Sequence, residues 1–244
     1  MKTAWYLGHR EDEVADRAIL IGDPDRIDRI AKLLDDVKFL TVRRGLRTIT
    51  GIFDEQQVTA VSFGMGAPIA TVVMHELANL GVKHFVRIGT AMYYPPADAG
   101  NFLLSESALS FEGTSEPYTM GSKTPVADHD LNKALSEAVL HSGARFHAGT
   151  YATFDAFYRD MFALEPETVA RVSANREMLL SKGVIATDME TSALLTAART
   201  LGVAFTSMCL GTVNGKTQEK LTAKLVQEGE ASLFNFALSG ITNV

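Results

Sequence analysis

Two patterns of hydrophobic and polar positions alternate along the chain. Short continuous apolar runs that end at a glycine, such as residues 18–21 and 84–89, predict buried strands. Residues 24–34 instead carry apolar side chains three or four positions apart, which predicts a helix. The two patterns follow one another from one end of the chain to the other, which is typical of α/β proteins.

The same patterns predict the other elements. Further strands are expected at 58–63, 101–109, 184–187 and 203–213. Further helices are expected at 68–80, 130–142, 165–181, 190–201 and 221–238. No repeat, low-complexity tract or linker interrupts them, so we expect a single domain over residues 1–244. Its fold class is predicted as three-layer α/β/α, with a central mixed, largely parallel twisted sheet covered by helices on both faces.

Composition narrows the classes of function. The chain has 244 residues, of which 46% are hydrophobic, so it can form a large core. Its net charge of -6 argues against broad binding to nucleic acid or to a membrane surface. The single cysteine, Cys209, excludes an intrachain disulfide and fits a reducing compartment. No secretory signal and no apolar run of about 18 residues is found, so we expect a cytoplasmic protein.

Two of the predicted strands end in residues suited to an anion. Gly22 lets the backbone approach a ligand, and Arg26 adds a guanidinium to the free N–H groups of a helix start. Arg87 interrupts an apolar strand and therefore either binds an anion or is paired internally, and the hydroxyl of Thr90 follows it. A plain helix start at Arg26 and an internal salt bridge at Arg87 are the structural alternatives.

Two later strand ends are suited to a sugar and a base. Glu190 can accept hydrogen bonds from two sugar hydroxyls while Met189 packs on the apolar face of the sugar. Asp188 and Glu190 can instead be acids that stabilise a helix N-terminus. Asn214 can hydrogen-bond a purine or pyrimidine leaving group, and an ordinary Asn-Gly turn is the alternative. In α/β sheets these strand ends are where ligands bind.

In combination these segments resemble the hexameric (trimer-of-dimers) nucleoside phosphorylases, the family of bacterial uridine phosphorylase and bacterial purine nucleoside phosphorylase. The matching segments are residues 6–8, 22–26, 44–45, 64–66, 87–90, 157–158 and 188–190. The resemblance implies the phosphorylase-type fold and phosphate-dependent cleavage of an N-glycosidic bond, giving a free base and ribose 1-phosphate. Inorganic phosphate is the co-substrate, and no other cofactor is expected.

The resemblance also implies residue roles. It assigns the phosphate site to Gly22, Arg26, Arg87, Thr90 and, from the neighbouring subunit, Arg44. It assigns the ribose site to Met189, Glu190 and Tyr6, the last standing where the family usually lends a histidine across the dimer. Catalysis falls to Arg87, Glu190 and Asn214, without a protein nucleophile. A homodimer is the minimal unit expected, and a hexamer the complete assembly.

The base site is where the sequence departs from the family. We assign it to Ala91, Met92, Phe157, Met161, Asp188 and Asn214. Phe157 matches the aromatic residue that stacks on the base, but Met92 stands where the family has glycine. Met161 and Ala163 replace the glutamine and arginine that read uracil in the uridine enzymes. Asn214 lies near the position of an aspartate that protonates purines, a role asparagine cannot take. We therefore expect an unusual or relaxed base preference.

Three functions remain open at this point. Phosphorolysis leads, with uridine-like nucleosides ahead of purine nucleosides. Phosphate-independent hydrolysis is one alternative, but the presence of Arg26, Arg44 and Arg87 argues against it. A non-catalytic nucleoside binder is the other alternative. No metal is expected, because Gly45 and Ile69 occupy the positions that build a monovalent-cation site in some uridine phosphorylases.

Overall fold

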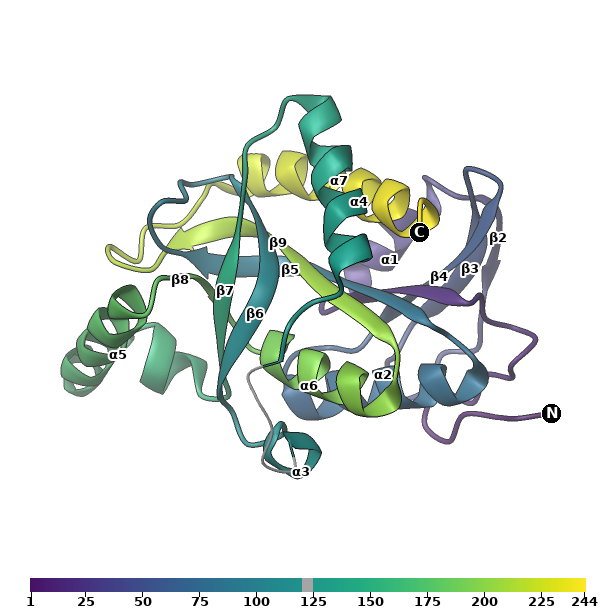
Figure 1. The fold of residues 1–244 in the computed structure, drawn as a ribbon, viewed down its shortest axis with the longest axis horizontal. Helices are drawn as coiled ribbons and strands as arrows, with labels where there is room; N and C mark the ends of the chain where they lie inside the picture. Colours follow the sequence, from purple (N-terminus) through teal and green to yellow (C-terminus); the bar gives the residue numbers. More distant parts are fainter. Residues whose placement is uncertain (120–124) are drawn as a thin grey trace.

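A computed structural model describes residues 1–119 and 125–244, and its strands form one sheet (Figure 1). The strands are β1 (Arg17–Ile21), β2 (Asp35–Phe39), β3 (Thr48–Phe53), β4 (Gln56–Ser62), β5 (His84–Tyr93), β6 (Phe102–Phe111), β7 (Phe146–Phe154), β8 (Val184–Asp188) and β9 (Ala204–Asn214). Within the described residues their order is β2-β3-β4-β1-β5-β8-β7-β6-β9. The additional pairing of β5 with β9 closes the last five strands into a ring.

The sheet is mixed, as expected, but less parallel than the pattern predicted. The pairs β1–β4, β1–β5, β5–β9, β6–β7 and β7–β8 are parallel. The pairs β2–β3, β3–β4, β5–β8 and β6–β9 are antiparallel. The sequence pattern missed β2, β3 and β7, so it predicted neither the antiparallel extension beyond β4 nor the closure of the ring.

Helices cover both faces of the sheet (Figure 1). They are α1 (Ile27–Ala31), α2 (Ala67–Leu80), α3 (Glu116–Thr119), α4 (His129–Ser142), α5 (Val169–Ser181), α6 (Thr191–Leu201) and α7 (Ala223–Thr242), with short turns η1 (Pro24–Arg26), η2 (Phe157–Met161) and η3 (Pro166–Thr168). α2 and α6 pack together on one face, and α4 and α7 on the other. Leu77 and Leu194 belong to the core under the first pair, and Leu135 and Phe236 to the core under the second.

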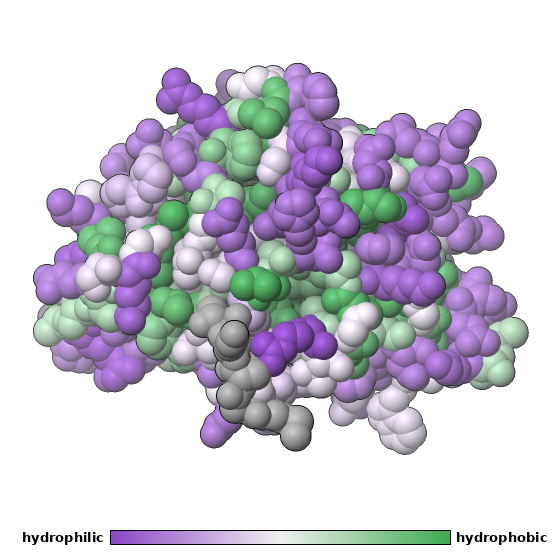
Figure 2. Space-filling view, viewed as in Figure 1, coloured by the Kyte–Doolittle hydropathy of each residue, from purple (hydrophilic) through white to green (hydrophobic). Residues whose placement is uncertain are grey.

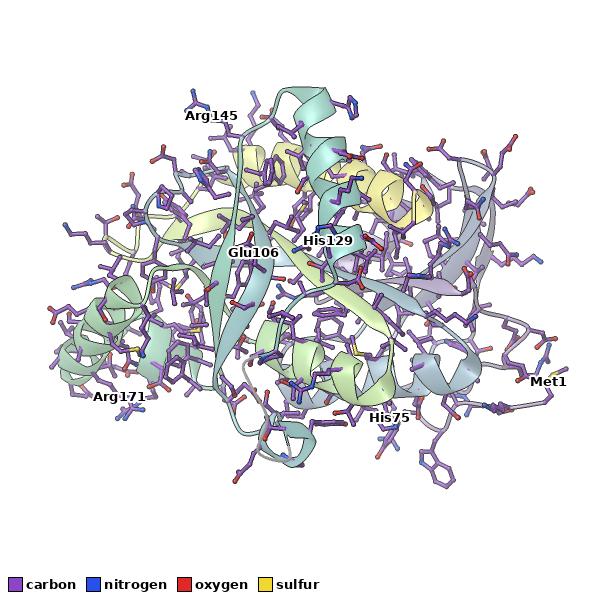
Figure 3. All side chains as sticks on the ribbon, viewed as in Figure 1. Met1, His75, Glu106, His129, Arg145 and Arg171 are labelled. Atoms are coloured by element: carbon purple, nitrogen blue, oxygen red, sulfur yellow. The ribbon has the colours of Figure 1, made fainter. Side chains whose placement is uncertain are left out.

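Charged side chains lie mainly at the surface. Arg145 and Arg171 point outward at the periphery (Figure 3), and the face shown in Figure 2 is largely hydrophilic with separate hydrophobic patches. No helix in the described part of the chain is long and apolar enough to cross a membrane. A few acids and arginines are buried instead, among them Arg87, Glu112, Asp188 and Glu190.

One of these buried acids, Glu112, joins the segment after β6 to the start of α6. Its carboxylate accepts hydrogen bonds from the hydroxyls of Ser110 at 2.8 Å, Ser192 at 2.9 Å and Ser115, and from the backbone N–H of Thr114 at 2.5 Å. Burial by itself raises the pKa of Glu112, but the hydrogen bonds from these serines outweigh it, so the pKa is below its ordinary value.

We expect Glu112→Gln to lower the apparent melting midpoint by about 5 °C at pH 7, because an amide cannot accept all of these hydrogen bonds. Because the carboxyl pKa is lowered on folding, the carboxylate stabilises the folded state at pH values above its ordinary pKa of 4.5. This stabilisation is lost as the pH falls from 4.5 through the lower pKa of the folded state. The difference between variant and wild type is therefore expected to narrow below pH 4.5 in scanning fluorimetry. A difference that is constant from pH 7 to pH 4 would contradict this assignment.

Candidate functional site

A cavity of about 840 Å³ opens at the carboxyl ends of β1, β5, β8 and β9. Many of the residues predicted for a site line it: Gly22, Arg26, Arg87, Thr90, Ala91, Met92, Phe157, Met161, Asp188, Met189 and Glu190. The strand register explains this convergence. β1 and β9 both run parallel to β5, and β8 pairs with β5 near the carboxyl ends of both strands, at Met92 and Thr187.

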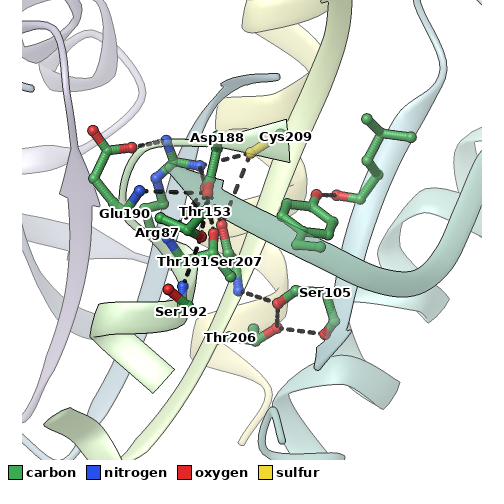
Figure 4. Close-up of polar contacts among 12 residues, drawn as sticks. Arg87, Ser105, Thr153, Asp188, Glu190, Thr191, Ser192, Thr206, Ser207 and Cys209 are labelled. Atoms are coloured by element: carbon green, nitrogen blue, oxygen red, sulfur yellow. Dashed lines mark hydrogen bonds and ion pairs between the residues drawn. The ribbon is translucent and has the colours of Figure 1, made fainter. Parts of the chain in front are cut away.

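Arg87 lies at the centre of a buried polar network (Figure 4). Its side chain is 5% exposed, and Nη2 donates to Glu190 Oε2 at 2.5 Å. Nη1 lies 2.9 Å from Asp188 Oδ2 and 2.8 Å from Cys209 Sγ. Burial alone lowers the pKa of the guanidinium, but Cys209, Asp188 and Glu190 together raise it above its ordinary value, so Arg87 is charged. The internal salt bridge foreseen as the alternative for Arg87 is therefore present.

Glu190 is held in the cavity wall by contacts to both of its carboxylate oxygens. Its Oε1 accepts the backbone N–H of Gly66 at 2.8 Å, and its Oε2 is paired with Arg87. Burial raises the pKa of the Glu190 carboxyl, and the neighbouring Asp188 raises it further, against the opposing effect of Arg87. Arg87 and the hydrogen bond from the Gly66 N–H both favour the charged carboxylate against this burial.

Asp188 serves the scaffold as well as the cavity wall. Its Oδ1 accepts from Thr153 Oγ1 at 2.8 Å, and Oδ2 accepts from the Thr191 hydroxyl and, at 3.3 Å, from the Thr191 backbone N–H. These contacts hold the first turn of α6. The structural interpretation, an acid at a helix N-terminus, therefore describes most of what Asp188 does.

Arg26 and Arg87 each keep one buried N–H without a partner. Within the described residues, neither Nε atom has a hydrogen-bond acceptor. Arg26 is otherwise held through Nη2, which lies 2.6 Å from Glu230 Oε1. A buried donor without an acceptor is costly, so two of them in the wall of one cavity point to an anion. Phosphate has the oxygen geometry that guanidinium groups match.

Two glycines make room for this arrangement. A Cβ at Gly89 would lie 3.0 Å from Arg87 Nη2 and 3.1 Å from its Cζ, so a side chain there would displace the guanidinium. A Cβ at Gly22 would lie 3.0 Å from the backbone oxygen of Gly64. Glycine at both positions thus allows close packing beside the arginines.

The opposite end of the cavity is apolar. Met92 and Met161 are buried there, at 2% and 4% exposure, in a cluster that includes Phe154. Phe157 stacks on Phe162 with ring centroids 5.8 Å apart, so its ring is fixed at the cavity wall. This end can hold a flat ring, with few polar groups to read its edge.

Three predicted site residues do not line the cavity. Asn214 Oδ1 accepts the backbone N–H groups of Lys216 at 2.8 Å and Thr217 at 3.1 Å, so the side chain forms a turn. Thr212 and Val213 line the cavity at this strand end, and the base contact of Asn214 stays a prediction.

Tyr6 and Arg44 lie together on the surface. The Arg44 guanidinium sits 4.6 Å from the centroid of the Tyr6 ring. Arg44 is exposed and has φ of 54°, a left-handed backbone that is uncommon for arginine. The Tyr6 segment is anchored by Glu76, which accepts the N–H groups of Tyr6 at 2.6 Å and Leu7 at 2.9 Å.

Sequence reasoning missed several residues of the site. Asp155 and Thr187 line the cavity; Thr187 begins the strand-end motif of residues 187–190 but was given no role, and Asp155 follows β7, which the sequence pattern missed. Glu230, the partner of Arg26, lies on α7 far along the chain, and no local pattern indicates that contact.

Comparisons with known proteins identify the family. The family model described as Phosphorylase superfamily matches residues 16–233. Uridine phosphorylase of Escherichia coli is 30% identical over 223 residues, covering 89% of this chain and 88% of that protein. Purine nucleoside phosphorylase DeoD-type of Oceanobacillus iheyensis is 28% identical over 240 residues, covering 97% and 98%. A crystal structure of uridine phosphorylase from Vibrio fischeri, complexed with 6-hydroxy-1-naphthoic acid, has a TM-score of 0.83 at 27% identity, covering 99% of this chain and 95% of that one.

Proposed function

Since the chain belongs to the phosphorylase superfamily and is a nucleoside phosphorylase, we propose that phosphorolysis takes place in the cavity that Arg26 and Arg87 line. The reaction cleaves the N-glycosidic bond with inorganic phosphate and gives a free base and ribose 1-phosphate. One observation carries the assignment of the site: two arginines from different strand ends line one cavity, each with a buried Nε–H that has no hydrogen-bond acceptor among the described residues, and Glu190 lines the same cavity paired with Arg87.

The chemistry is positioning combined with electrostatics. A phosphate held by Arg26 and Arg87 lies beneath the anomeric carbon, while Glu190 accepts hydrogen bonds from the sugar hydroxyls. As the C–N bond breaks, its electron pair goes to the base, and the sugar gains positive charge that the phosphate stabilises. A phosphate oxygen then forms the new bond to the anomeric carbon, and the base takes up a proton. Phosphate is the co-substrate, and no protein nucleophile or cofactor is needed.

The base preference that we propose is relaxed, with uridine-like nucleosides ahead of purine nucleosides. Met92, Met161 and Phe157 give the cavity an apolar end. Apolar contact discriminates weakly between flat rings, whereas paired polar groups discriminate strongly. Asn214 carries an amide, so that residue does not offer the acid that a purine leaving group would use.

A homodimer is proposed as the minimal unit, with three dimers in the complete assembly. Tyr6 and Arg44 support this, because they are presented together on the surface outside the chain's own cavity. A second copy that brings them to this cavity would add a third guanidinium to the phosphate site. We place the enzyme in the cytoplasm, since its single cysteine is buried and suits a reducing compartment.

A nucleoside panel tests this function. Base release from uridine, thymidine, inosine and adenosine is measured with and without phosphate, together with ribose 1-phosphate formation. We expect turnover only with phosphate, and kcat/KM values for uridine and inosine within about tenfold of each other. Release without phosphate would identify a nucleosidase instead. Thermal stabilisation by nucleosides without turnover would identify a non-catalytic binder.

A further inference from the structure

Arg26 is tied to the C-terminal helix by a buried carboxylate. Glu230 lies on α7, and its side chain is only 8% exposed. One of its oxygens, Oε1, lies 2.6 Å from Arg26 Nη2, and the other, Oε2, pairs with Arg29 Nη1. A single acid on α7 thus bridges two arginines that belong to η1 and α1.

Arg29 is itself fixed to the same helix. Its Nη2 donates to the backbone oxygen of Gln227 at 3.0 Å, and its guanidinium lies 4.8 Å from the centre of the Phe234 ring. Arg29 does not line the cavity, whereas Arg26 does. Glu230 therefore has one partner in the scaffold and one in the cavity wall, which is the arrangement of a brace.

The brace solves an electrostatic difficulty. Without an acid between them, two guanidinium groups of like charge in a partly buried space would repel each other and turn Arg26 away. With Glu230 in place, the three side chains keep a net charge of about +1, from the formal charges of two arginines and one glutamate. Arg26 is held through Nη2, while its Nε–H has no hydrogen-bond acceptor among the described residues and lies 3.9 Å from Asp23 Oδ2, an ion-pair distance.

We propose that Glu230 is a positioning residue for phosphate binding, which fixes Arg26 from the C-terminal helix and leaves its Nε–H for the anion. This inference rests on the proposed function, because it takes phosphate as the ligand of Arg26. It makes α7 part of the phosphate site, although α7 does not line the cavity.

The direction in which KM for phosphate changes in Glu230→Gln separates a positioning role from a purely electrostatic one. Glu230→Gln removes one negative charge near the anion, so the net charge there becomes more positive by one unit. If Glu230 acted only through its charge, KM for phosphate would fall. If Glu230 positions Arg26, KM for phosphate is expected to rise about tenfold while KM for uridine changes less than about twofold. Glu230→Asp keeps the charge but shortens the side chain, and it is expected to behave like Glu230→Gln.

Two further variants serve as controls. Glu228→Gln removes an exposed acid of the same helix, paired with Lys224 at 3.9 Å, and is expected to leave KM for phosphate unchanged. The double variant Arg29→Gln with Glu230→Gln keeps the net charge of the trio and removes the repulsion between arginines. Positioning predicts that its KM for phosphate stays high, whereas an electrostatic role predicts the wild-type value. If Glu230→Gln does not fold, the double variant takes its place in the test.

A measurement without turnover completes the design. The upward shift of the melting midpoint caused by inorganic phosphate is compared across the same variants, and it is expected to shrink in every variant that lacks Glu230. If wild type is stabilised by phosphate but does not turn over nucleosides, the proposed function fails while the positioning role is still read from this shift. A lower KM for phosphate in Glu230→Gln, a wild-type value in Glu230→Asp, or no phosphate effect on wild type would each overturn the proposal.

Discussion

Arg87→Gln is expected to reduce kcat/KM for phosphorolysis about a thousandfold, the size of effect seen when a preorganised donor to developing charge is removed. The variant loses the cation that faces the proposed phosphate, and it leaves Asp188 and Glu190 as neighbouring buried acids without their counter-charge. Glu190, whose pKa is already raised by burial, then takes up a proton more readily and accepts sugar hydroxyls less well. Steady-state kinetics with phosphate and uridine varied separately measures both losses.

Folding and chemistry must be separated in this experiment. Removing one partner of a buried ion pair costs about 3–5 kcal/mol, so the Arg87→Gln protein is assayed well below its melting midpoint, with circular dichroism to confirm the fold. Arg87→Lys is the matched control, because it keeps the charge but not the planar fork, and it is expected to lose activity about tenfold to a hundredfold. A folded Arg87→Gln enzyme within tenfold of wild type would mean that Arg87 serves only its ion pairs.

Where the sequence predicted the fold well, the signal was a continuous apolar run or a helical period. β1 and α2 are examples, since almost every inward position in them is aliphatic and glycines mark their ends. β2 is an exposed edge strand, and β7 mixes glycine, threonine and histidine with its apolar residues, so neither gives a clear period. The β5–β9 pairing that closes the ring joins strands far apart in the chain, and local patterns contain no information about it.

The candidate site divides in the same way. The rule that ligands bind at the carboxyl ends of strands, joined to the family resemblance, placed Gly22, Arg26, Arg87 and Glu190 correctly in one cavity wall. It could not decide between an ion pair and an anion site at Arg87, because the acids that pair with Nη1 and Nη2 leave Nε without an acceptor among the described residues. At Asn214 the local turn took the side-chain oxygen, and no ligand geometry could be read from a sequence to show it.

Arg44→Gln is expected to raise KM for phosphate about a hundredfold. Arg44 does not line the cavity of its own chain, but in the proposed dimer it pairs with the phosphate bound in the neighbouring subunit, and the variant loses this charge-assisted pairing. Arg44 is exposed and packs on the Tyr6 ring, so its removal should leave the melting midpoint within about 1 °C of wild type. Tyr6→Phe keeps the ring beneath the guanidinium and loses the hydroxyl. It is therefore expected to preserve KM for phosphate and to weaken only nucleosides that carry a 5′-hydroxyl.

Mixing two impaired variants, assayed at a phosphate concentration near the wild-type KM, tests the shared site directly. In a mixed dimer of Arg44→Gln and Arg87→Gln subunits, the cavity of the Arg44→Gln subunit keeps its own Arg87 and receives an intact Arg44 from its partner. The other cavity lacks both. Random exchange of equal amounts of the two subunits thus restores about a quarter of the sites, because half of the dimers are mixed and each of these has one complete cavity. Activity that stays at the level of the separate variants after exchange, verified by mass spectrometry of mixed dimers, would place Arg44 outside the phosphate site altogether.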